Sequence, residues 1–290
     1  MIPAAFDYVR ASSLAQAIDL LRDDPDGTKL LAGGHTLLPA LKLRLASPEL
    51  LIDIGGIAEL KGIEISETGI RIGALTTHAE LFASEPLNKE LPIFRQAASV
   101  IADSQVRNRG TIGGSVAHAD PGADFPVILS ALNAAFVVQS AAGTRTISVD
   151  DFFTDFFTTA MSANEILTEV HVPIPSAGSG SGYAKLPHPA SGYVVVSAGA
   201  LITRQASGTC IASRLAIGGL DSGPLRAMAT EIELQGKPLT SQLIASAAAK
   251  AADESDPVDD PYASAEYKKH VATVYARKAI ETAVQRAATN

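Results

Sequence analysis

The sequence predicts an α+β protein in three parts, and three observations support this prediction. A strand, a pair of glycines, a helix and a further strand follow one another near the start of the chain. Two hairpin patterns occupy the middle of the chain, where apolar and polar residues alternate on either side of turn residues. The segment SAGSGSG, at 176–182, has the composition of a flexible linker, and strands followed by two helices come after it.

Residues 1–56 are the first predicted part. Two serines precede LAQAIDLLRD, at 14–23, whose apolar residues recur every three or four positions, so we expect a serine-capped amphipathic helix. TKLLAG, at 28–33, and ELLIDI, at 49–54, read as buried strands. TLLPALKLRLAS, at 36–47, reads as a short helix interrupted near its proline. Together these elements make a compact α/β unit.

Residues 57–175 are the second predicted part. Alternating patterns at 60–81 and 134–153 each predict a hairpin, the first of them turning around Glu67, Thr68 and Gly69. We expect helices in THAELFASEPL and in LPIFRQAASVIAD, and an apolar helix after the glycine-containing segment that follows them. EILTEVHVPIP is predicted to be a strand that ends in prolines.

Residues 176–290 are the third predicted part. After the linker, YVVVSAGALITRQ and CIASRLAIGGL read as strands. SQLIASAAAKAADES, at 241–255, and the segment at 264–287 read as amphipathic helices with alanine-rich faces. We expect a small sheet backed by these helices, with the alanine-rich faces packed internally, although packing against a partner protein is the alternative.

Composition excludes several classes of function. The formal net charge is −8 and no extended basic face is present, so general nucleic-acid binding is not expected. Cys210 is the only cysteine, which excludes an internal disulfide and a cysteine-ligated iron–sulfur cluster. The histidines lack the spacing of a metal site, and no serine lies in a nucleophile elbow, so we assign no metal ligand and no catalytic residue. No signal peptide or membrane-spanning run is evident, which predicts a cytoplasmic protein without a membrane span.

Two glycine-containing segments are the candidate ligand-binding sites in the sequence. In AGGHT, at 32–36, adjacent glycines permit positive φ angles, and several N–H groups can converge on one anion just before a helix. TIGGSVAHADPGAD, at 111–124, repeats the pattern with hydroxyls beside its glycines. Each segment alone could be a plain structural turn, but two in one chain favour a dinucleotide. Because G-x-G-x-x-G and P-loop motifs are absent, the binding mode is neither of those two.

Two aspartates near the second segment have open interpretations. Asp120 precedes a proline and could accept from a ribose hydroxyl or form an Asx turn. Asp124 could bind a sugar hydroxyl or cap the apolar helix that follows it.

The two glycine segments, in this order and spacing, resemble the FAD-binding medium subunits of molybdenum hydroxylases. The carbon monoxide dehydrogenase medium chains are the nearest type, and the flavin domain of the xanthine dehydrogenase family is more distant. The similarity spans nearly the whole chain, including PAAFDYVRASSLAQAIDLL and YAKLPHPASGYVVVSAGA. The resemblance implies a two-part FAD-binding domain of the vanillyl-alcohol-oxidase (PCMH) type, followed by a small C-terminal α+β domain.

The resemblance also implies binding residues. The two glycine loops would clasp the FAD pyrophosphate from two sides, Asp124 would hold a sugar hydroxyl, and Lys185 and Tyr193 would lie near the flavin ring. FAD would be bound non-covalently, with His35 packed over it. The loop residues transferred in this way are Ala32, Gly33, Gly34, His35 and Thr36 in the first loop, and Thr111, Ile112, Gly113, Gly114 and Ser115 in the second.

The implied activity is electron transfer within a larger oxidoreductase. A [2Fe-2S] small subunit would deliver electrons from a molybdopterin-binding large subunit, in a dimer of heterotrimers, and the FAD would pass them to NAD, a quinone or oxygen. The alternatives are a self-contained FAD-dependent oxidoreductase of the same broad fold, and an assembly module whose glycines serve only as turns.

Overall fold

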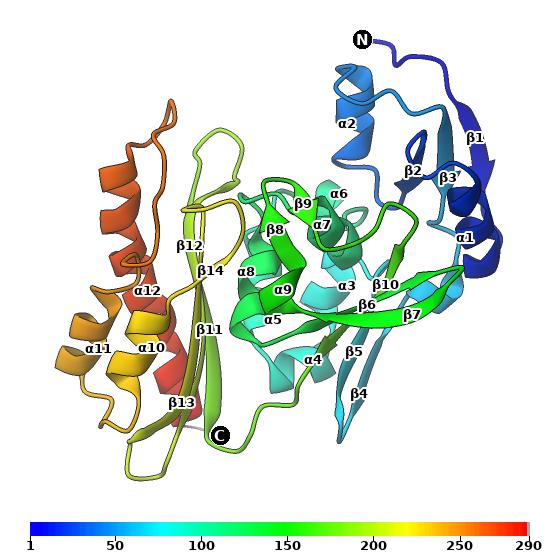
Figure 1. Ribbon diagram of the computed structural model, residues 1–290. Coiled ribbons are helices and arrows are strands. Elements are labelled where there is room, and N and C mark those ends of the chain that lie inside the picture. The colour runs from blue at the N-terminus through cyan, green and yellow to red at the C-terminus, as the bar shows by residue number, and fades with distance from the viewer. Residues whose placement is uncertain (289–290) are drawn as a thin grey trace.

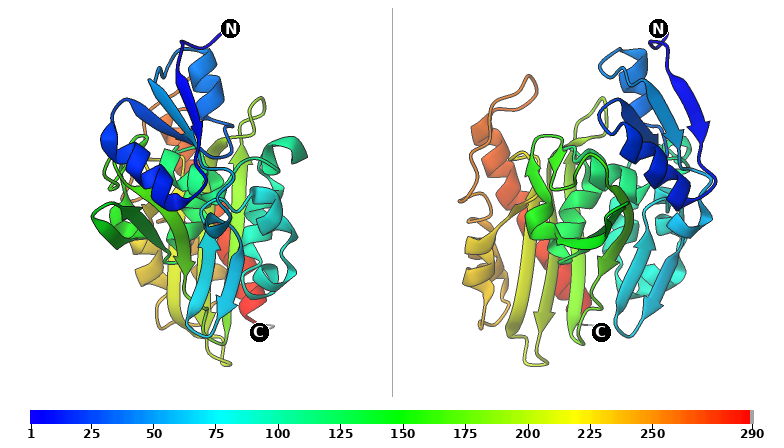
Figure 2. Two further views of the ribbon diagram at one scale, coloured as in Figure 1. Left: turned by 90° about the vertical axis from the view of Figure 1, so that its right-hand side faces the viewer. Right: turned by 45° about the vertical axis from the view of Figure 1, so that its right-hand side comes forward.

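The computed structural model describes residues 1–288, whose main sheets follow one another along the chain (Figure 1). A parallel sheet of three strands comes first, an antiparallel sheet of five strands second, and an antiparallel sheet of four strands last. Figure 2 shows that the first sheet lies at one end of the molecule, beyond the middle sheet. Among the described residues, no helix is long and apolar enough to cross a bilayer.

The first part confirms the predicted α/β unit. Its central strand is β3, with β1 and β2 parallel to it on either side. The Ser13 hydroxyl caps α1 by accepting from the Gln16 amide, and the apolar face of this helix is buried. The elements are β1 (Asp7–Arg10), α1 (Leu14–Asp23), β2 (Thr28–Leu31), α2 (Leu37–Lys42), β3 (Leu50–Asp53) and the 3-10 helix η1 (Ala58–Leu60).

The middle sheet confirms both predicted hairpins. Strands run in the order β4-β5-β10-β6-β7, and in the first hairpin Ser66 pairs with Gly69 across a two-residue turn. The apolar face of this sheet packs on helices, with Phe94, Phe125 and Phe136 among the fully buried side chains. The strands are β4 (Ile63–Ser66), β5 (Gly69–Gly73), β6 (Ala135–Ser140), β7 (Gly143–Ser148) and β10 (Ile166–Val172).

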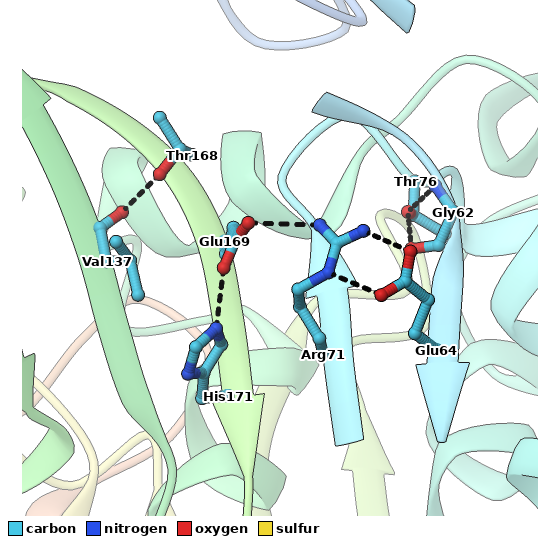
Figure 3. Close-up of polar contacts among 8 residues, drawn as sticks. All are labelled: Gly62, Glu64, Arg71, Thr76, Val137, Thr168, Glu169 and His171. Carbon is cyan, nitrogen blue, oxygen red and sulfur yellow. Dashed lines mark hydrogen bonds and ion pairs between the residues drawn. The ribbon is translucent and has the colours of Figure 1, made fainter. Parts of the chain in front are cut away.

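The opposite face of the middle sheet carries a polar network (Figure 3). Arg71 on β5 forms hydrogen bonds of 2.6 and 3.0 Å with Glu64 on β4 and reaches Glu169 on β10 at 3.0 Å. His171 contacts the other carboxylate oxygen of Glu169 at 2.6 Å. These side chains tie three neighbouring strands together on their solvent side.

The helices of the middle part differ in several respects from prediction, since short helices at 104–107, 112–118 and 149–152 were not expected. The expected single helix at THAELFASEPL is divided at Ser84, because this residue is extended and its hydroxyl caps a new helix with Pro86 in the first turn. The elements are α3 (His78–Ala83), α4 (Glu85–Glu90), α5 (Ile93–Ser99), α6 (Ser104–Arg107), α7 (Ile112–His118), α8 (Asp124–Ala131), α9 (Val149–Phe152), β8 (Phe153–Asp155) and β9 (Thr158–Thr159).

The last part is a sheet between two helical layers (Figure 1). Helices α10 to α12 lie on one face, and α5 and α8 of the middle part lie on the other. The alanine-rich faces of the last two helices pack internally, as expected. The elements are β11 (Ser179–Pro187), β12 (Val194–Arg204), β13 (Cys210–Gly218), β14 (Leu225–Arg226), α10 (Met228–Leu234), α11 (Ser241–Ala248) and α12 (Ala265–Ala287).

The expected linker at 176–182 is wrong for most of its length. Residues 179–182 are buried and belong to β11. Their small side chains are needed because α12 crosses very close to this strand: a methyl group on Gly180 or Gly182 would lie 2.2 to 2.4 Å from the backbone of α12. The glycines therefore serve packing rather than flexibility.

Candidate functional site

The two glycine loops predicted from the sequence meet in the folded chain. Gly33, at the end of β2, packs directly against the backbone before α7, where a methyl group in its place would lie 2.2 Å from the carbonyl oxygen of Arg109. The fold therefore brings together segments that are more than seventy residues apart, and only glycine permits their close approach.

An open cleft of about 170 Å³ lies at this junction. The first loop contributes Ala32 and Gly33 to its lining, and the segment before α7 contributes Asn108, Arg109 and Thr111. The remaining walls come from the chain after β3, the segment after η1, and the segment that leads into α3. All of the contributing elements belong to the first two parts of the chain.

The first loop presents a row of free backbone donors. No N–H group from Gly33 to Leu37 donates a hydrogen bond within the described part of the chain. Gly34 has a φ of +78°, which turns the backbone into α2, and the Thr36 hydroxyl makes no capping bond. Successive free N–H groups in such a turn form a concave site for an anion.

The second predicted loop is the start of a helix, because Thr111 is the N-cap of α7 and Ile112 to Ser115 form its first turn. This segment, still called the second loop here, is more fully engaged in its own fold than the predicted two-sided clasp requires. The amides of Ile112 and Gly113 donate to the carbonyl oxygens of Thr76 and Ala74, at 3.0 and 2.8 Å. The Gly114 amide donates to the Thr111 hydroxyl at 3.1 Å, and the Ser115 amide donates to the Thr111 carbonyl. These bonds fix the loop beside the 74–78 segment, so the free amides of the site lie mainly in the first loop.

Asp124 and Lys185 form a buried ion pair. The Lys185 ammonium lies 2.9 and 3.0 Å from the two carboxylate oxygens, and the side chains are 3% and 7% exposed for Lys185 and Asp124. The Tyr183 hydroxyl donates to the same carboxylate at 2.7 Å. Burial raises the pKa of Asp124, whereas Lys185 and Tyr183 act in the opposite direction. Asp124 is the first residue of α8 rather than its cap.

Tyr193 lies on the surface beside the chain that precedes α8. A methyl group on Gly122 would lie 3.1 Å from the Tyr193 ring, and the amide of Val194 donates to the Gly122 carbonyl at 3.0 Å. Half of the Tyr193 side chain is exposed. Asp120 forms the Asx turn that was one of its two interpretations, since its carboxylate accepts from the Gly122 amide at 2.8 Å.

The histidines of this region differ in their surroundings. His35 is exposed, and its Nδ1 atom lies 3.2 Å from the Gly33 carbonyl oxygen. His118 contacts the ring of Phe157, and burial lowers its pKa. His78 is buried against Phe125 below the second loop, and burial, followed by the charges of His35 and Arg107, lowers its pKa to about 4.

Several residues of the cleft were not identified from the sequence. Thr77 and Glu80 form a capping box at the start of α3, in which the Glu80 carboxylate accepts from the amide and hydroxyl of Thr77 at 2.7 Å. The T-x-x-E pattern is a recognisable helix start. Lys61 and Arg109 have no local signal, because their place in the cleft depends on the tertiary fold.

The site can bind an anion but lacks other recognisable chemistry. The free amides suit phosphate oxygens. Among the described residues, no group of three or more His, Cys, Asp or Glu side chains could hold a metal ion.

Comparison with protein families matches most of the chain. Residues 4–175 match the family described as "FAD binding domain in molybdopterin dehydrogenase". Residues 181–283 match "CO dehydrogenase flavoprotein C-terminal domain". The first match ends just after β10, and the second begins within β11.

Curated relatives align over almost their full length. The carbon monoxide dehydrogenase medium chain of Hydrogenophaga pseudoflava is 38% identical over 288 residues, covering 99% of this chain and 100% of the relative. The glyceraldehyde dehydrogenase medium chain of Sulfolobus acidocaldarius is 37% identical, covering 97% and 99%. The xanthine dehydrogenase FAD-binding subunit of Escherichia coli O157:H7 is 31% identical, covering 96% and 95%.

Solved structures agree with this assignment. Carbon monoxide dehydrogenase from Hydrogenophaga pseudoflava superposes with a TM-score of 0.94 at 39% identity, covering 99% of each chain. Quinoline 2-oxidoreductase from Pseudomonas putida 86 gives a TM-score of 0.93 at 33% identity, covering 99% and 100%. The fold, the paired glycine loops and the full-length matches together place this chain in the family of FAD-binding medium subunits of molybdenum hydroxylases.

Proposed function

We propose that this chain binds FAD non-covalently in the cleft between the glycine loops and serves as the electron-transfer subunit of a molybdenum hydroxylase. The observation that carries the proposal is the row of free N–H groups from Gly33 to Leu37, at a cleft large enough for a diphosphate. Bound FAD supplies the redox chemistry, accepting electrons and releasing them to another carrier. The chain supplies binding and orientation.

Each predicted binding residue has a proposed part in this site. The amides of the first loop hold the diphosphate, and the second loop forms the opposite wall, with its Thr111 N–H and Ser115 hydroxyl as further donors. The exposed ring of Tyr193 is suited to stacking on a flavin. The Asp124 carboxylate and the Lys185 ammonium are bound to each other in this structure. We therefore propose that this ion pair supports the site by holding α8 and β11 together.

The proposed assembly follows from what this chain lacks. Its single cysteine, Cys210, is buried in β13 and cannot ligate an iron–sulfur cluster. We therefore propose a [2Fe-2S] small subunit as the electron donor and a molybdopterin-binding large subunit as the site of substrate oxidation, in a dimer of heterotrimers. The final acceptor is an external carrier such as NAD, a quinone or oxygen.

The direct test is FAD retention by the purified chain. We expect a flavin absorption spectrum to persist after incubation with FAD and desalting, and acid to release all of the flavin. Flavin that stays with the precipitated protein after acid treatment would contradict non-covalent binding. A folded chain that retains no FAD, both alone and in the complex purified from its source, would contradict the proposed function.

A further inference from the structure

Two cations at the cleft lack carboxylate partners. Lys61 and Arg109 line the cleft and are exposed, yet neither forms an ion pair or a side-chain hydrogen bond within the described residues. Other arginines of the chain, such as Arg71 and Arg145, are bound to glutamates. The carboxylate of the cleft, Glu80, is engaged in the capping box of α3 instead.

The backbone that carries Lys61 is firmly held. On one side, the Leu75 amide donates to the Leu60 carbonyl at 2.8 Å. On the other, Gly62 binds the Thr76 hydroxyl at 3.1 Å through both its amide and its carbonyl (Figure 3). The lysine side chain therefore projects from a fixed point next to the start of β4.

The backbone that carries Arg109 is held at the contact between the loops. Its amide donates to Val106 at 3.0 Å, and its carbonyl lies against Gly33. Arg107, two residues earlier, is used differently, since its guanidinium donates to the carbonyls of Ile101 and Ala102. The backbone of Arg109 is therefore fixed where the row of free amides begins, and its guanidinium has no ion pair or hydrogen bond among the described residues.

We propose that Lys61 and Arg109 bind the diphosphate of the dinucleotide together with the amides of the first loop. This inference rests on the proposed function and extends it, because it assigns charge recognition of the phosphates to two side chains. A dianionic diphosphate held by amides alone keeps its charge, whereas two nearby cations neutralise it. Opposite charges at an exposed site also make binding sensitive to salt.

The test compares FAD affinity among charge variants of the full chain. We expect Lys61→Gln and Arg109→Gln each to weaken FAD binding about tenfold, and the double variant more, by titration at low salt. Lys61→Arg and Arg109→Lys should stay within about threefold of the parent chain, since charge is retained. Lys89→Gln, an exposed lysine on α4 without an ion pair, is the matched control and should leave affinity unchanged.

Thermal unfolding of the FAD-free variants, which should match that of the parent chain, separates lost binding from lost folding. Raising the salt concentration should weaken FAD binding by the parent chain more than by the double variant. The inference is overturned if either Gln variant binds FAD as tightly as the parent, or if the charge-conserving variants lose as much affinity as the Gln variants. If the parent chain binds no FAD, the proposed function is contradicted, and the inference, which rests on it, is contradicted as well.

Discussion

At the scale of single residues, Gly34 is the clearest candidate for a backbone conformation required by a ligand. Its φ of +78° turns the first loop so that five successive N–H groups remain free. Gly34→Ala places a side chain in the left-handed region, at a cost of about 1 kcal/mol. We expect this strain to distort the row of donors and to weaken FAD binding about tenfold, measured by titration of the purified chain.

Gly208→Ala is the matched control for this prediction. Gly208 has a φ of +88° in the turn between β12 and β13, and open space surrounds the position of a methyl group. Both variants carry the strain of the left-handed conformation, and a methyl group on Gly34 would also lie 3.0 Å from the Leu38 side chain, so Gly34→Ala should lose somewhat more stability. Only Gly34→Ala should lose affinity for FAD. Equal FAD affinity in both variants would mean that the first loop is merely a turn.

His78 provides a second prediction, which concerns pH. Burial lowers its pKa from 6.5 to about 4 in the folded chain, so the folded state binds fewer protons than the unfolded state between these values. Its contribution to stability is complete above pH 6.5 and is lost as the pH falls toward 4, by about 3 kcal/mol in total.

The measurement is the free energy of unfolding of the FAD-free chain in urea at several pH values. The parent chain should lose more stability between pH 7 and pH 4.5 than His78→Leu, which cannot titrate there. The difference between the two slopes isolates His78 from the carboxylates that both proteins share. Parallel slopes would show that His78 does not carry the effect.

The residues that could be predicted from the sequence have local sequence signals, whereas the residues that were missed depend on tertiary contacts. Glycine pairs near helix starts are local signals, so both segments were predicted, and the fold places Gly33 against Arg109 and Gly110, just before the second segment. Lys61 and Arg109 are ordinary surface residue types, and their meeting at one cleft is a product of tertiary structure. The hydrogen bonds of the second-loop amides could not be predicted either, because the carbonyl groups that accept them, those of Ala74 and Thr76, belong to another segment.

At the scale of elements, periodicity predicted most strands and helices, and the failures involve small residues and short elements. SAGSGSG has the composition of a linker, yet four of its residues are the buried start of β11. Local composition reports conformational freedom and does not reveal that α12 approaches this strand. Short elements without a strong period, such as β1 and α10, were not predicted either.

The contact between β11 and α12 leads to the third prediction. A methyl group on Gly182 would lie 2.4 Å from the Ala279 carbonyl oxygen, so Gly182→Ala should force the helix and the strand apart. We expect a loss of about 1–3 kcal/mol in the free energy of unfolding. Ser181→Ala, in the same strand, should be nearly neutral because the buried Ser181 hydroxyl has no hydrogen-bond partner among the described residues. Comparable losses in both variants would argue against close packing as the cause.

At the scale of the whole molecule, relatives of similar length carry names that refer to different compounds. Chains of nearly the same length and fold belong to proteins named for carbon monoxide, glyceraldehyde and quinoline. The common fold of these medium subunits therefore accompanies different substrates. This agrees with the proposal that this chain handles electrons and that another subunit selects the substrate.

The Asp124–Lys185 pair connects the two family regions of the chain. Asp124 begins α8 in the region that matches the FAD-binding family, and Lys185 lies on β11 in the region that matches the C-terminal family. Both side chains are almost completely buried, so neither can be hydrated when its partner is lost. The pair should therefore couple the folding of the two regions.

Lys185→Met tests this coupling, because it leaves the Asp124 carboxylate buried with the Tyr183 hydroxyl as its remaining side-chain donor among the described residues. We expect a loss of about 3–5 kcal/mol in the free energy of unfolding at pH 7. Asp124→Asn combined with Lys185→Met removes both charges, so the double variant should be more stable than the sum of the single losses predicts. Urea unfolding followed by far-UV circular dichroism measures all four proteins. Additive losses of stability would show that the ion pair does not link the two regions energetically. If the parent chain unfolds in one transition and Lys185→Met unfolds in two, the ion pair makes the two regions unfold together.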